Sequence, residues 1–583
     1  MLKSVSQDSL QQIETRLHYL YGEQAHALVN RLYMMIGRYG IGLNGYRPTR
    51  QHAPWDETDI VLITYGDMVQ QPEEPPLYTL NTFLQSHVGD AIRTIHLLPF
   101  FPYSSDDGFS VKDFRTVDPA LGTWRAVETL RSTYSLMFDL VINHVSSQSE
   151  WFRDYLNGIA PYRDFFIEVS PDTDLSQVMR PRSHPLLSET HTRAGKRYIW
   201  TTFSADQADL NFGNPEVLFE MLDVLFWYIA KGARIIRLDA IAYLWKIVGT
   251  SCIHLTQTHE VVKLLRDIVD MVAPGVLLLT ETNVPHRENI SYFGNDDEAH
   301  MVYQFSLPPL LAHGLLTGCA GHLTRWAQAL PPLTERTTFF NFTASHDGIG
   351  LRPLQGLLSG AEFDRFIAHA QRVGGRVSHK RNADGSDSPY ELNITYFDIF
   401  ADSEEGISEA QIARFLSSQA IMLAMRGMPA IYFNSLFGAR NNERGVEETG
   451  QNRTINREKW ERARLESLLA DPALHHQRVF NAFLHFLNVR RAHPAFHPNG
   501  NQTILDLGDT IFAFDRMAPD GSEMITCITN FTDASVDIPL DDRLPSLHEG
   551  DSLVDLIQDK APKRSQGKLQ LAPYQTVWLT RVE

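Results

Sequence analysis

Short apolar runs rich in β-branched and aromatic residues alternate along this chain with longer amphipathic stretches. Such an alternation is typical of βα units, in which each buried strand of a parallel sheet is followed by a helix that covers it. The apolar runs are residues 60–65, 92–100, 136–144, 233–241, 275–282, 300–305, 337–347 and 428–436. Eight such runs predict an α/β fold whose strands close into a (β/α)8 barrel, the TIM barrel.

Two of the connecting stretches predict helices with clear ends. The stretch 215–232 begins with Pro215, which suits a first helical turn, and it stops at a glycine. The stretch 258–275 carries its apolar residues on one stripe and ends at a Pro-Gly pair. A further helix, rich in aromatic residues and histidines, is expected at about 475–493.

The spacing of the runs predicts the organisation of the whole chain. Residues 1–55 form an N-terminal helical extension, and residues 56–498 form the barrel. The intervals 145–200 and 351–410, after the third and seventh strands, are too long for simple loops and are expected to be insertions. Residues 499–583 show period-two strands and turns, which predict a C-terminal antiparallel β domain.

Charge and composition exclude several classes of protein. Of the 583 residues 43% are hydrophobic, so the chain is neither disordered nor a low-complexity fibre. The 52 basic residues against 70 acidic ones give a net charge of −18, which argues against nucleic acid or an anionic membrane as a partner. The chain shows no signal peptide and no apolar segment long enough for a membrane, and its three separated cysteines suit a reducing compartment. We therefore expect a cytoplasmic protein.

Charged and hydrogen-bonding residues stand at the ends of several predicted strands. In a (β/α)8 barrel these ends build the active site. An aspartate after a strand is often only a helix cap, and a buried Arg–Asp pair is often only structural. Four strand ends that present such groups together, in order, predict a catalytic site instead. The residues are Asp139, Asn143, His144, Arg237, Asp239, Glu281, His346 and Asp347.

Paired carboxylates at one face suit glycosidic chemistry, in which one carboxylate attacks the sugar and a protonated one assists the leaving oxygen. Arg237 lies two residues before Asp239 and faces the same side, so we expect it to keep Asp239 ionised with a low pKa. Glu281 follows an apolar run, where burial would raise its pKa toward that of an acid. Asp239 is thus predicted as nucleophile, Glu281 as acid/base, and Asp347 as the group that stabilises the transition state through the sugar hydroxyls.

At these residues the sequence resembles the alpha-amylase superfamily of glycoside hydrolases (glycoside hydrolase family 13). The segments DLVINH, RIIRLDAI, LLLTET and FTASHD match its four motif regions in order. The resemblance implies a retaining double displacement with Asp239, Glu281 and Asp347 as the triad. It also implies that His144 and His346 contact the glucose unit before the cleaved bond.

A narrower resemblance, from about residue 55 to the C-terminus, is to the sucrose phosphorylase subfamily, which transfers glucose to inorganic phosphate. It is carried by SDDGFSV, RLDAIAYLWKIVGTSC, QFSLPPLL, SHDGIGLRPL and NRTINR. The resemblance implies that Asp106 and Arg453 close the glucose pocket, with Phe109, Gln207 and Tyr243 nearby.

Two positions depart from the sucrose phosphorylases on the acceptor side. This chain has Asn283 where they carry a histidine after the acid/base, and Glu391 where they carry a glutamine after the mobile-loop tyrosine, Tyr390. With the long N-terminal segment and GTSCIHL, these variants look most like the glucosylglycerate phosphorylases of the subfamily. Sucrose phosphorylase and glucosylglycerol phosphorylase stay as alternatives, and sucrose 6′-phosphate is a further substrate among close relatives.

The segment before Tyr390 contains a basic cluster, Arg376, His379, Lys380 and Arg381. It is either a solvated surface run or an anion-recognition site at the mouth of the active site. Glu391 is either a charge at a helix or strand edge or an acceptor of hydrogen bonds from a polyol. Glycerate would fit an anion site at the basic cluster and a hydroxyl acceptor at Glu391. The glycines and turn residues of the segment predict a loop that changes conformation between the binding of acceptor and the binding of phosphate.

The sequence thus predicts a retaining glucoside phosphorylase, a hexosyltransferase of carbohydrate metabolism, that converts an α-glucoside and phosphate to α-glucose 1-phosphate. A hydrolase or transglucosidase on the same barrel, or a catalytically inactive binding module, are the more distant alternatives. Metal and nucleotide motifs are lacking, so we expect no cofactor and only small-molecule partners. The oligomeric state is left open, with a homodimer as one option.

Overall fold

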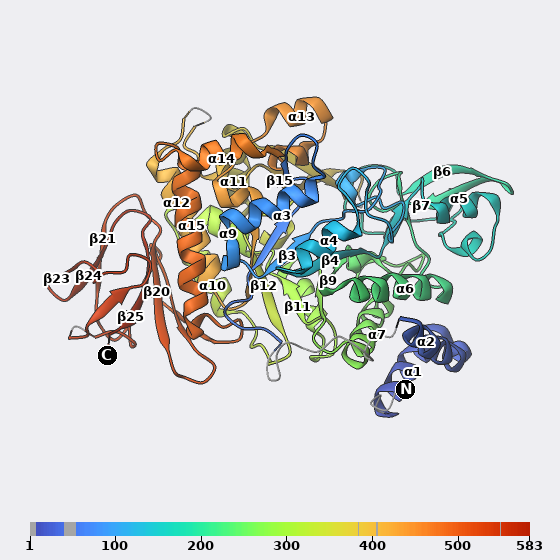
Figure 1. Ribbon diagram of the computed structural model, residues 1–583, viewed down its shortest axis with the longest axis horizontal. Helices are drawn as coiled ribbons and strands as arrows, with labels where there is room; N and C mark the ends of the chain where they lie inside the picture. Colours follow the sequence, from blue (N-terminus) through green and yellow to red (C-terminus); the bar gives the residue numbers. More distant parts are fainter. Residues whose placement is uncertain (1–6, 40–53, 383, 404–405, 549, 583) are drawn as a thin grey trace.

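A closed barrel of parallel strands forms the centre of the molecule (Figure 1). The computed structural model describes residues 7–39, 54–382, 384–403, 406–548 and 550–582. Within these residues eight strands close the barrel, and each lies in one of the eight predicted apolar runs, which confirms the fold class. The strands are β1 (Val61–Thr64), β3 (Thr94–Leu97), β4 (Ser135–Val141), β9 (Ala233–Asp239), β10 (Leu277–Thr280), β11 (Met301–Tyr303), β12 (Thr338–Phe342) and β16 (Met428–Tyr432).

Helices surround the barrel because each strand is buried on both faces and needs a covering layer. The predicted helices 215–232 and 258–275 are α6 (Pro215–Lys231) and α7 (Thr256–Val272). Asn214 caps α6 by accepting from the Glu216 N–H, and Gly232 ends it with φ of 99°, a conformation that favours glycine. The other long helices are α3 (Pro76–His87), α4 (Trp124–Arg131), α9 (Leu307–Thr317), α10 (Gly321–Gln328), α12 (Glu409–Ala424), α14 (Arg462–Ala470) and α15 (His475–Ala492).

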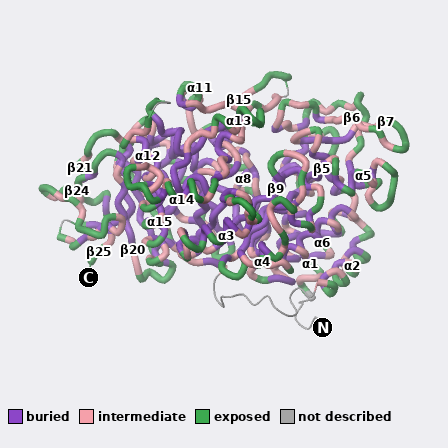
Figure 2. Tube along the Cα trace, turned by 45° about the horizontal axis from the view of Figure 1, so that its top comes forward, coloured by how far each residue is buried: buried purple, intermediate pink, exposed green. Residues whose placement is uncertain are grey.

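The segment 145–200 folds beside the carboxyl ends of the barrel strands. It holds α5 (Glu150–Asn157) and the hairpin of β6 (Leu187–Thr192) and β7 (Gly195–Trp200), on the right of Figure 1. The short strand β5 (His144–Ser146) pairs antiparallel with β8 (Gln207–Asp209), so His144 and Gln207 are brought to the same ribbon. Figure 2 shows the exposed stretches gathered at the periphery, as around β7 and β24, and the buried ones in the barrel.

The segment 351–410, expected as an insertion after the seventh strand, contains helix α11 (Gly360–Arg372) and a β-hairpin. Strand β14 (Arg376–Arg381) pairs with β15 (Asp387–Asn393), and β15 also pairs with β13 (Ile349–Gly350). The segment before Tyr390 is thus a two-stranded hairpin, and its rearrangement between the binding of acceptor and of phosphate stays a prediction. The second strand is held because its residues 390–393 are buried, and the polar turn residues only connect the two strands.

The described part of the predicted N-terminal extension is a helical hairpin, α1 (Gln7–Tyr21) and α2 (Ala25–Tyr39), which packs on α7 and α6. Residues 1–6 and 40–53 of that extension lie outside the described part. Arg16 is 8% exposed and donates to Glu260 Oε1 at 2.8 Å and to Asp267, both on α7. The extension is thus anchored to the barrel by a half-buried charge cluster.

We expect the Arg16→Ala variant to loosen this hairpin without unfolding the barrel. Hydrogen bonds to charged groups contribute about 1.5–3 kcal/mol, so α1 amides should exchange roughly 30-fold faster. Hydrogen exchange followed by mass spectrometry measures this change. His26→Ala, which removes an exposed contact with Glu14, is the control and should leave exchange unchanged. Exchange in α1 that is equal for the two variants would contradict the anchoring role.

Beyond α15 the chain forms antiparallel sheets, as predicted (red in Figure 1). One sheet has the order β18-β19-β20-β25-β22 and a smaller one the order β21-β24-β23. Their bounds are β18 (Asn501–Leu505), β19 (Ile511–Met517), β20 (Met524–Asn530), β21 (Val536–Pro539), β22 (Leu553–Asp555), β23 (Arg564–Ser565), β24 (Lys568–Leu571) and β25 (Thr576–Arg581). Among the described residues, no helix has the length and apolar character needed to cross a membrane.

Candidate active site

Arg237 joins the carboxylates at the carboxyl ends of the barrel strands. It lies on β9, and its Nη1 donates to Asp139 Oδ1 on β4 at 2.5 Å and to Asp239 Oδ1 at 2.7 Å. Its Nη2 is 4.0 Å from Glu281 Oε2, just after β10. Arg237 is 2% exposed, so the guanidinium acts in a medium of low dielectric constant. One buried guanidinium thus contacts three carboxyl groups from three neighbouring strands.

Asp139 is held from a second side by His96, a residue that the sequence analysis missed. His96 Nε2 donates to Asp139 Oδ2 at 2.7 Å from the adjacent strand β3, and both residues are buried. Burial raises the pKa of Asp139, but His96 and Arg237 outweigh it and bring the pKa to about 2. Asp139 therefore stays ionised. The only available signal for His96 was a lone histidine inside an apolar run.

Asp239 and Glu281 are two buried carboxyls that both face the Arg237 guanidinium. Burial raises the pKa of both to about 7, against the pull of Arg237. The expectation of a low pKa for Asp239 was therefore wrong, because desolvation outweighs the cation. Arg237 lies closer to Asp239 than to Glu281, so the proton that the pair retains near neutral pH resides on Glu281. Glu281 also accepts from the Ala240 N–H at 3.1 Å.

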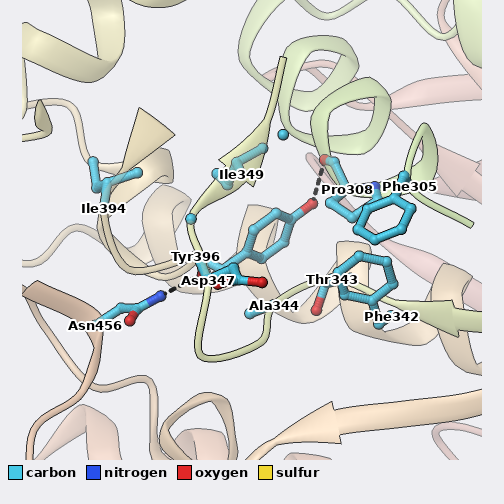
Figure 3. Close-up of a pocket in the computed structure, with 12 residues that line it drawn as sticks. Phe305, Pro308, Phe342, Thr343, Ala344, Asp347, Ile349, Ile394, Tyr396 and Asn456 are labelled. Atoms are coloured by element: carbon cyan, nitrogen blue, oxygen red, sulfur yellow. Dashed lines mark hydrogen bonds between the residues drawn. The ribbon is translucent and has the colours of Figure 1, made fainter. Parts of the chain in front are cut away.

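Asp347 lies on the loop that follows β12 and is held by Arg453. Arg453 Nη1 is 2.5 Å from Asp347 Oδ1, and Asn456 Nδ2 donates to the Asp347 carbonyl at 2.8 Å. Burial raises the pKa of Asp347, but Arg453 and His346 hold it below its ordinary value. Figure 3 shows the loop packed against Tyr396, whose hydroxyl donates to the Pro308 carbonyl at 2.8 Å. The cavity drawn there has a volume of about 10 Å³, room for about one water molecule.

The residues predicted to surround glucose lie close to these acids. The Phe109 ring stacks on His346 with centroids 4.7 Å apart and 6° between the planes. His144 Nε2 donates to the Phe109 carbonyl at 3.0 Å. Gln207 Nε2 donates to Asp106 Oδ2 at 3.3 Å. Tyr243 is buried in the turn after β9, edge-on to Phe203.

A cavity of about 1030 Å³ opens beside this group. Its lining joins the β3 loop, the segment before β8, the β14–β15 hairpin and the Arg453 segment. Among the lining residues are Asp106, Arg182, Phe203, Gln207, His379, Glu391, Asn393 and Arg453. A space of this size, with few apolar walls, fits a polar ligand such as a sugar.

The basic cluster is not gathered at this cavity. Arg376 pairs with Glu443 at 3.1 Å, and Arg381 pairs with Asp387 at 2.9 Å. Lys380 donates to Asn382 Oδ1 at 3.0 Å. Among the four predicted cations, His379 is the one that lines the cavity.

The other residues predicted to bind the acceptor lie at defined positions near the site. Tyr390 is buried, with the Arg182 guanidinium 5.2 Å from its ring centroid. Asn283 packs against Gly350, where an added Cβ would lie 2.6 Å from Asn283 Oδ1. Glu391, expected as a charge at a helix or strand edge or as an acceptor of hydrogen bonds from a polyol, is 1% exposed and accepts hydrogen bonds from Arg453.

Several cations near the site escaped the sequence analysis. Arg182, from an irregular stretch, lies over Tyr390 and Phe203. Arg352 is 6% exposed. Burial raises the pKa of Tyr390, and the charges of Arg182 and Arg352 partly offset this rise. Lys246 donates to Asn143 Oδ1 at 2.7 Å and pairs with Asp209 at 2.6 Å, behind His144. Arg182 lies in no quoted motif, whereas Arg352 and Lys246 lie within the segments SHDGIGLRPL and RLDAIAYLWKIVGTSC, whose resemblance was a signal that could have pointed to them.

Comparison with known proteins identifies relatives of this chain. The catalytic domain of alpha-amylase matches residues 89–316. The chain is 46% identical to the glucosylglycerate phosphorylase of Allomeiothermus silvanus over 91% of this chain and 94% of that protein. It is 45% identical to that of Escherichia coli, over 91% and 93% respectively. The sucrose phosphorylase of Streptococcus mutans is 26% identical, over 83% of this chain and 98% of its own.

Solved structures show the same fold at lower identity. The crystal structure of sucrose 6F-phosphate phosphorylase from Thermoanaerobacter thermosaccharolyticum superposes with a TM-score of 0.71 and 24% identity. The match covers 81% of this chain and 94% of that one. From its identity to relatives over nearly their whole length, the chain belongs to the glucosylglycerate phosphorylase family of alpha-amylase-type enzymes.

Proposed function

We propose that the protein is a glucosylglycerate phosphorylase that acts by a retaining mechanism. The observation that carries this proposal is the 46% identity to such enzymes over 94% of their length. The buried group of Arg237, Asp239 and Glu281 supports it, because it offers one ionised and one protonated carboxyl at a single face. We also place the enzyme in the cytoplasm, where its free thiols Cys252, Cys319 and Cys527 would stay reduced.

In the first step the Asp239 carboxylate attacks C1 of the glucosyl unit as the bond to the glycerate oxygen breaks. Glu281 gives its proton to that oxygen, so glycerate leaves as an alcohol and a β-glucosyl ester of Asp239 forms. In the second step a phosphate oxygen attacks C1 from the face that glycerate left. The ester bond breaks, Asp239 is regenerated as a carboxylate, and Glu281 recovers a proton from the incoming phosphate. The product is α-glucose 1-phosphate, with net retention.

The glucosyl unit would lie among the residues that the fold brings together next to Asp239. Asp347 and Arg453 would bind its hydroxyls, and His144 and His346 would contact it from the side of Phe109. Asp106, Gln207 and Tyr243 complete the set. Interactions of Asp347 with the sugar that strengthen as the ring distorts would favour the transition state over the bound substrate.

Three cations on the acceptor side, Arg182, Arg352 and Lys380, would receive the anions that this reaction needs. Burial and the nearby Arg352 lower the pKa of Lys380, as expected for cations brought close to one another. Arg352 has Glu288 as a distant counter-ion, at 3.9 Å. Phosphate and glycerate are both anions, so a chain of net charge −18 must attract them locally. Arg182, which lines the cavity, is the member best placed to bind a carboxylate or phosphate.

We expect Arg182→Gln to raise the KM for both phosphate and D-glycerate by about 10- to 100-fold, because a charge-assisted hydrogen bond is lost. Hydrolysis of the glucosyl-enzyme by water should change little, since water needs no cation. Steady-state rates with α-glucosyl fluoride, a donor that brings no phosphate or carboxylate, with and without each anion, separate the effects. Arg336→Gln, an exposed arginine paired with Asp270 before β12, is the control. A hydrolysis rate that falls by the same factor would refute the anion role.

The proposed function is tested by following products with and without phosphate. Glucosylglycerate and phosphate should give glucose 1-phosphate, and the synthetic direction should accept D-glycerate in preference to glycerol and fructose. Free glucose as the main product under both conditions would mean a hydrolase. Efficient transfer to fructose or glycerol but not to glycerate would show that the enzyme is a phosphorylase with a different acceptor specificity.

A further inference from the structure

Glu391 and Arg453 form a two-point contact inside the site, although they lie far apart along the chain. Arg453 Nε donates to Glu391 Oε1 at 3.0 Å and Nη2 donates to Oε2 at 2.7 Å. Asn393 Nδ2 also donates to Oε1 at 3.0 Å. A carboxylate has about four lone-pair positions, and three of them are used here. Little capacity is left for a ligand.

The same guanidinium makes the contact with Asp347 described above. Glu391 occupies the Nε–Nη2 edge of Arg453, and Nη1 lies 2.5 Å from Asp347 Oδ1 as an ion pair, without the alignment of a hydrogen bond. Because a guanidinium is planar and rigid, fixing one edge fixes the direction of the remaining nitrogen. The side chain of Glu391 therefore fixes the Arg453 guanidinium in the position where its charge lies against Asp347.

The backbone brings Glu391 to the Asp347 loop independently of Arg453. Residue Gly350 of β13 is paired with Glu391 of β15. At Gly348 an added Cβ would lie 2.7 Å from Glu391 Cγ and 2.3 Å from the Leu392 carbonyl oxygen. The loop that carries Asp347 thus packs directly on Glu391, and a glycine is needed there for the approach.

We propose that Glu391 is a positioning residue of the glucosyl site and not a ligand of the acceptor. It holds Arg453 against Asp347, and so it acts on whichever reaction passes through the glucosyl-enzyme. This inference rests on the proposed function, because it assigns Asp347 and Arg453 to the glucosyl unit. Glutamine at this position would keep the size of the side chain. It would remove the charge and could present an amide N–H₂ group to the donors of Arg453.

The test compares two reactions of Glu391→Gln that share the glucosyl unit and differ in the acceptor. One is the transfer from glucose 1-phosphate to D-glycerate, and the other is arsenolysis of glucose 1-phosphate, which needs no glycerate. We expect both to fall by the same factor, about 10- to 100-fold, with the KM for glycerate unchanged. A fall in glycerate transfer alone, or a raised KM for glycerate, would make Glu391 an acceptor ligand and overturn the proposal.

Matched variants separate positioning from loss of fold. Glu409→Gln breaks a two-point contact of the same kind with Arg478, at the surface, and should leave both reactions intact. Asn393→Ala keeps both charges and removes one hydrogen bond to Glu391, so it tests the idea even if Glu391→Gln does not fold. Equal losses of a few-fold in the two reactions would support the proposal, and a loss in glycerate transfer alone would overturn it.

A double-mutant cycle adds a second readout. If Glu391 acts through Arg453, the Glu391→Gln/Arg453→Lys variant should be no slower than Arg453→Lys. Losses that multiply would mean independent roles and would contradict the proposal. Failure of the proposed function is distinguishable from failure of this inference. If the proposed function were wrong, the wild-type enzyme itself would fail to transfer glucose from glucose 1-phosphate to glycerate.

Discussion

The Asp239→Asn variant is expected to lose turnover in both directions by about 10⁴-fold or more. An uncharged amide oxygen cannot displace the acceptor at C1 and form the glucosyl ester. No neighbouring described carboxylate is placed to replace it. Asp139 is 1% exposed and bonded to both His96 and Arg237, and Glu281 is needed as the acid. Initial rates of glucose 1-phosphate formation measure the loss, and mass spectrometry should detect a trapped glucosyl-enzyme in the wild type alone.

The control must show that turnover is lost because the nucleophile is removed, and not because the protein is misfolded or fails to bind its substrate. Asp223→Asn makes the same substitution at a part-buried aspartate of α6, whose carboxylate accepts from Arg115 at 2.5 Å outside the barrel. It should keep near wild-type turnover. Binding of glucose 1-phosphate to Asp239→Asn, measured by calorimetry, should persist because the other sugar contacts remain. Turnover within tenfold of the wild type would show that Asp239 is not the nucleophile.

Sequence periodicity predicts the barrel because parallel strands buried on both faces read as continuous apolar runs. Each of the eight runs contains one barrel strand, and the acids at their ends meet because those ends share one rim. Asp239 and Glu281 could therefore be named as neighbours before any distance was known. Their pKa values could not be predicted in this way, because the desolvation of each carboxyl depends on how the whole barrel packs around it.

The rest of the site was less predictable because it is built from contacts distant in sequence. The pairing of Glu391 with Arg453 joins β15 to the segment after α13 (Glu443–Thr449), and nothing local to either residue signals it. Arg182 comes from an irregular stretch with no motif. The sequence left open whether the cluster 376–381 is a solvated surface run or an anion site. Strand alternation sends its members to different neighbours, and two of them pair with acids.

The Glu281→Gln variant is expected to lose about 10³-fold in phosphorolysis of glucosylglycerate, since a general acid contributes about 10²- to 10⁴-fold. The loss should nearly vanish for the first step with α-glucosyl fluoride, because fluoride leaves without a proton. This contrast distinguishes an acid/base from a nucleophile, whose loss no leaving group restores. Single-turnover kinetics with the two substrates measure it. Glu523→Gln, another glutamate that accepts from a backbone N–H, is the control.

The same residue sets the expected pH dependence. Burial raises the pKa of Glu281 to about 7, so its acid form is complete below that pH and is lost as the pH rises through it. For the wild type, kcat/KM with glucosylglycerate should fall about tenfold per pH unit above this range. With α-glucosyl fluoride, or in Glu281→Gln, this alkaline limb should disappear from the first step. A limb that persists in the variant would belong to another group, and Glu281 would then not be the acid.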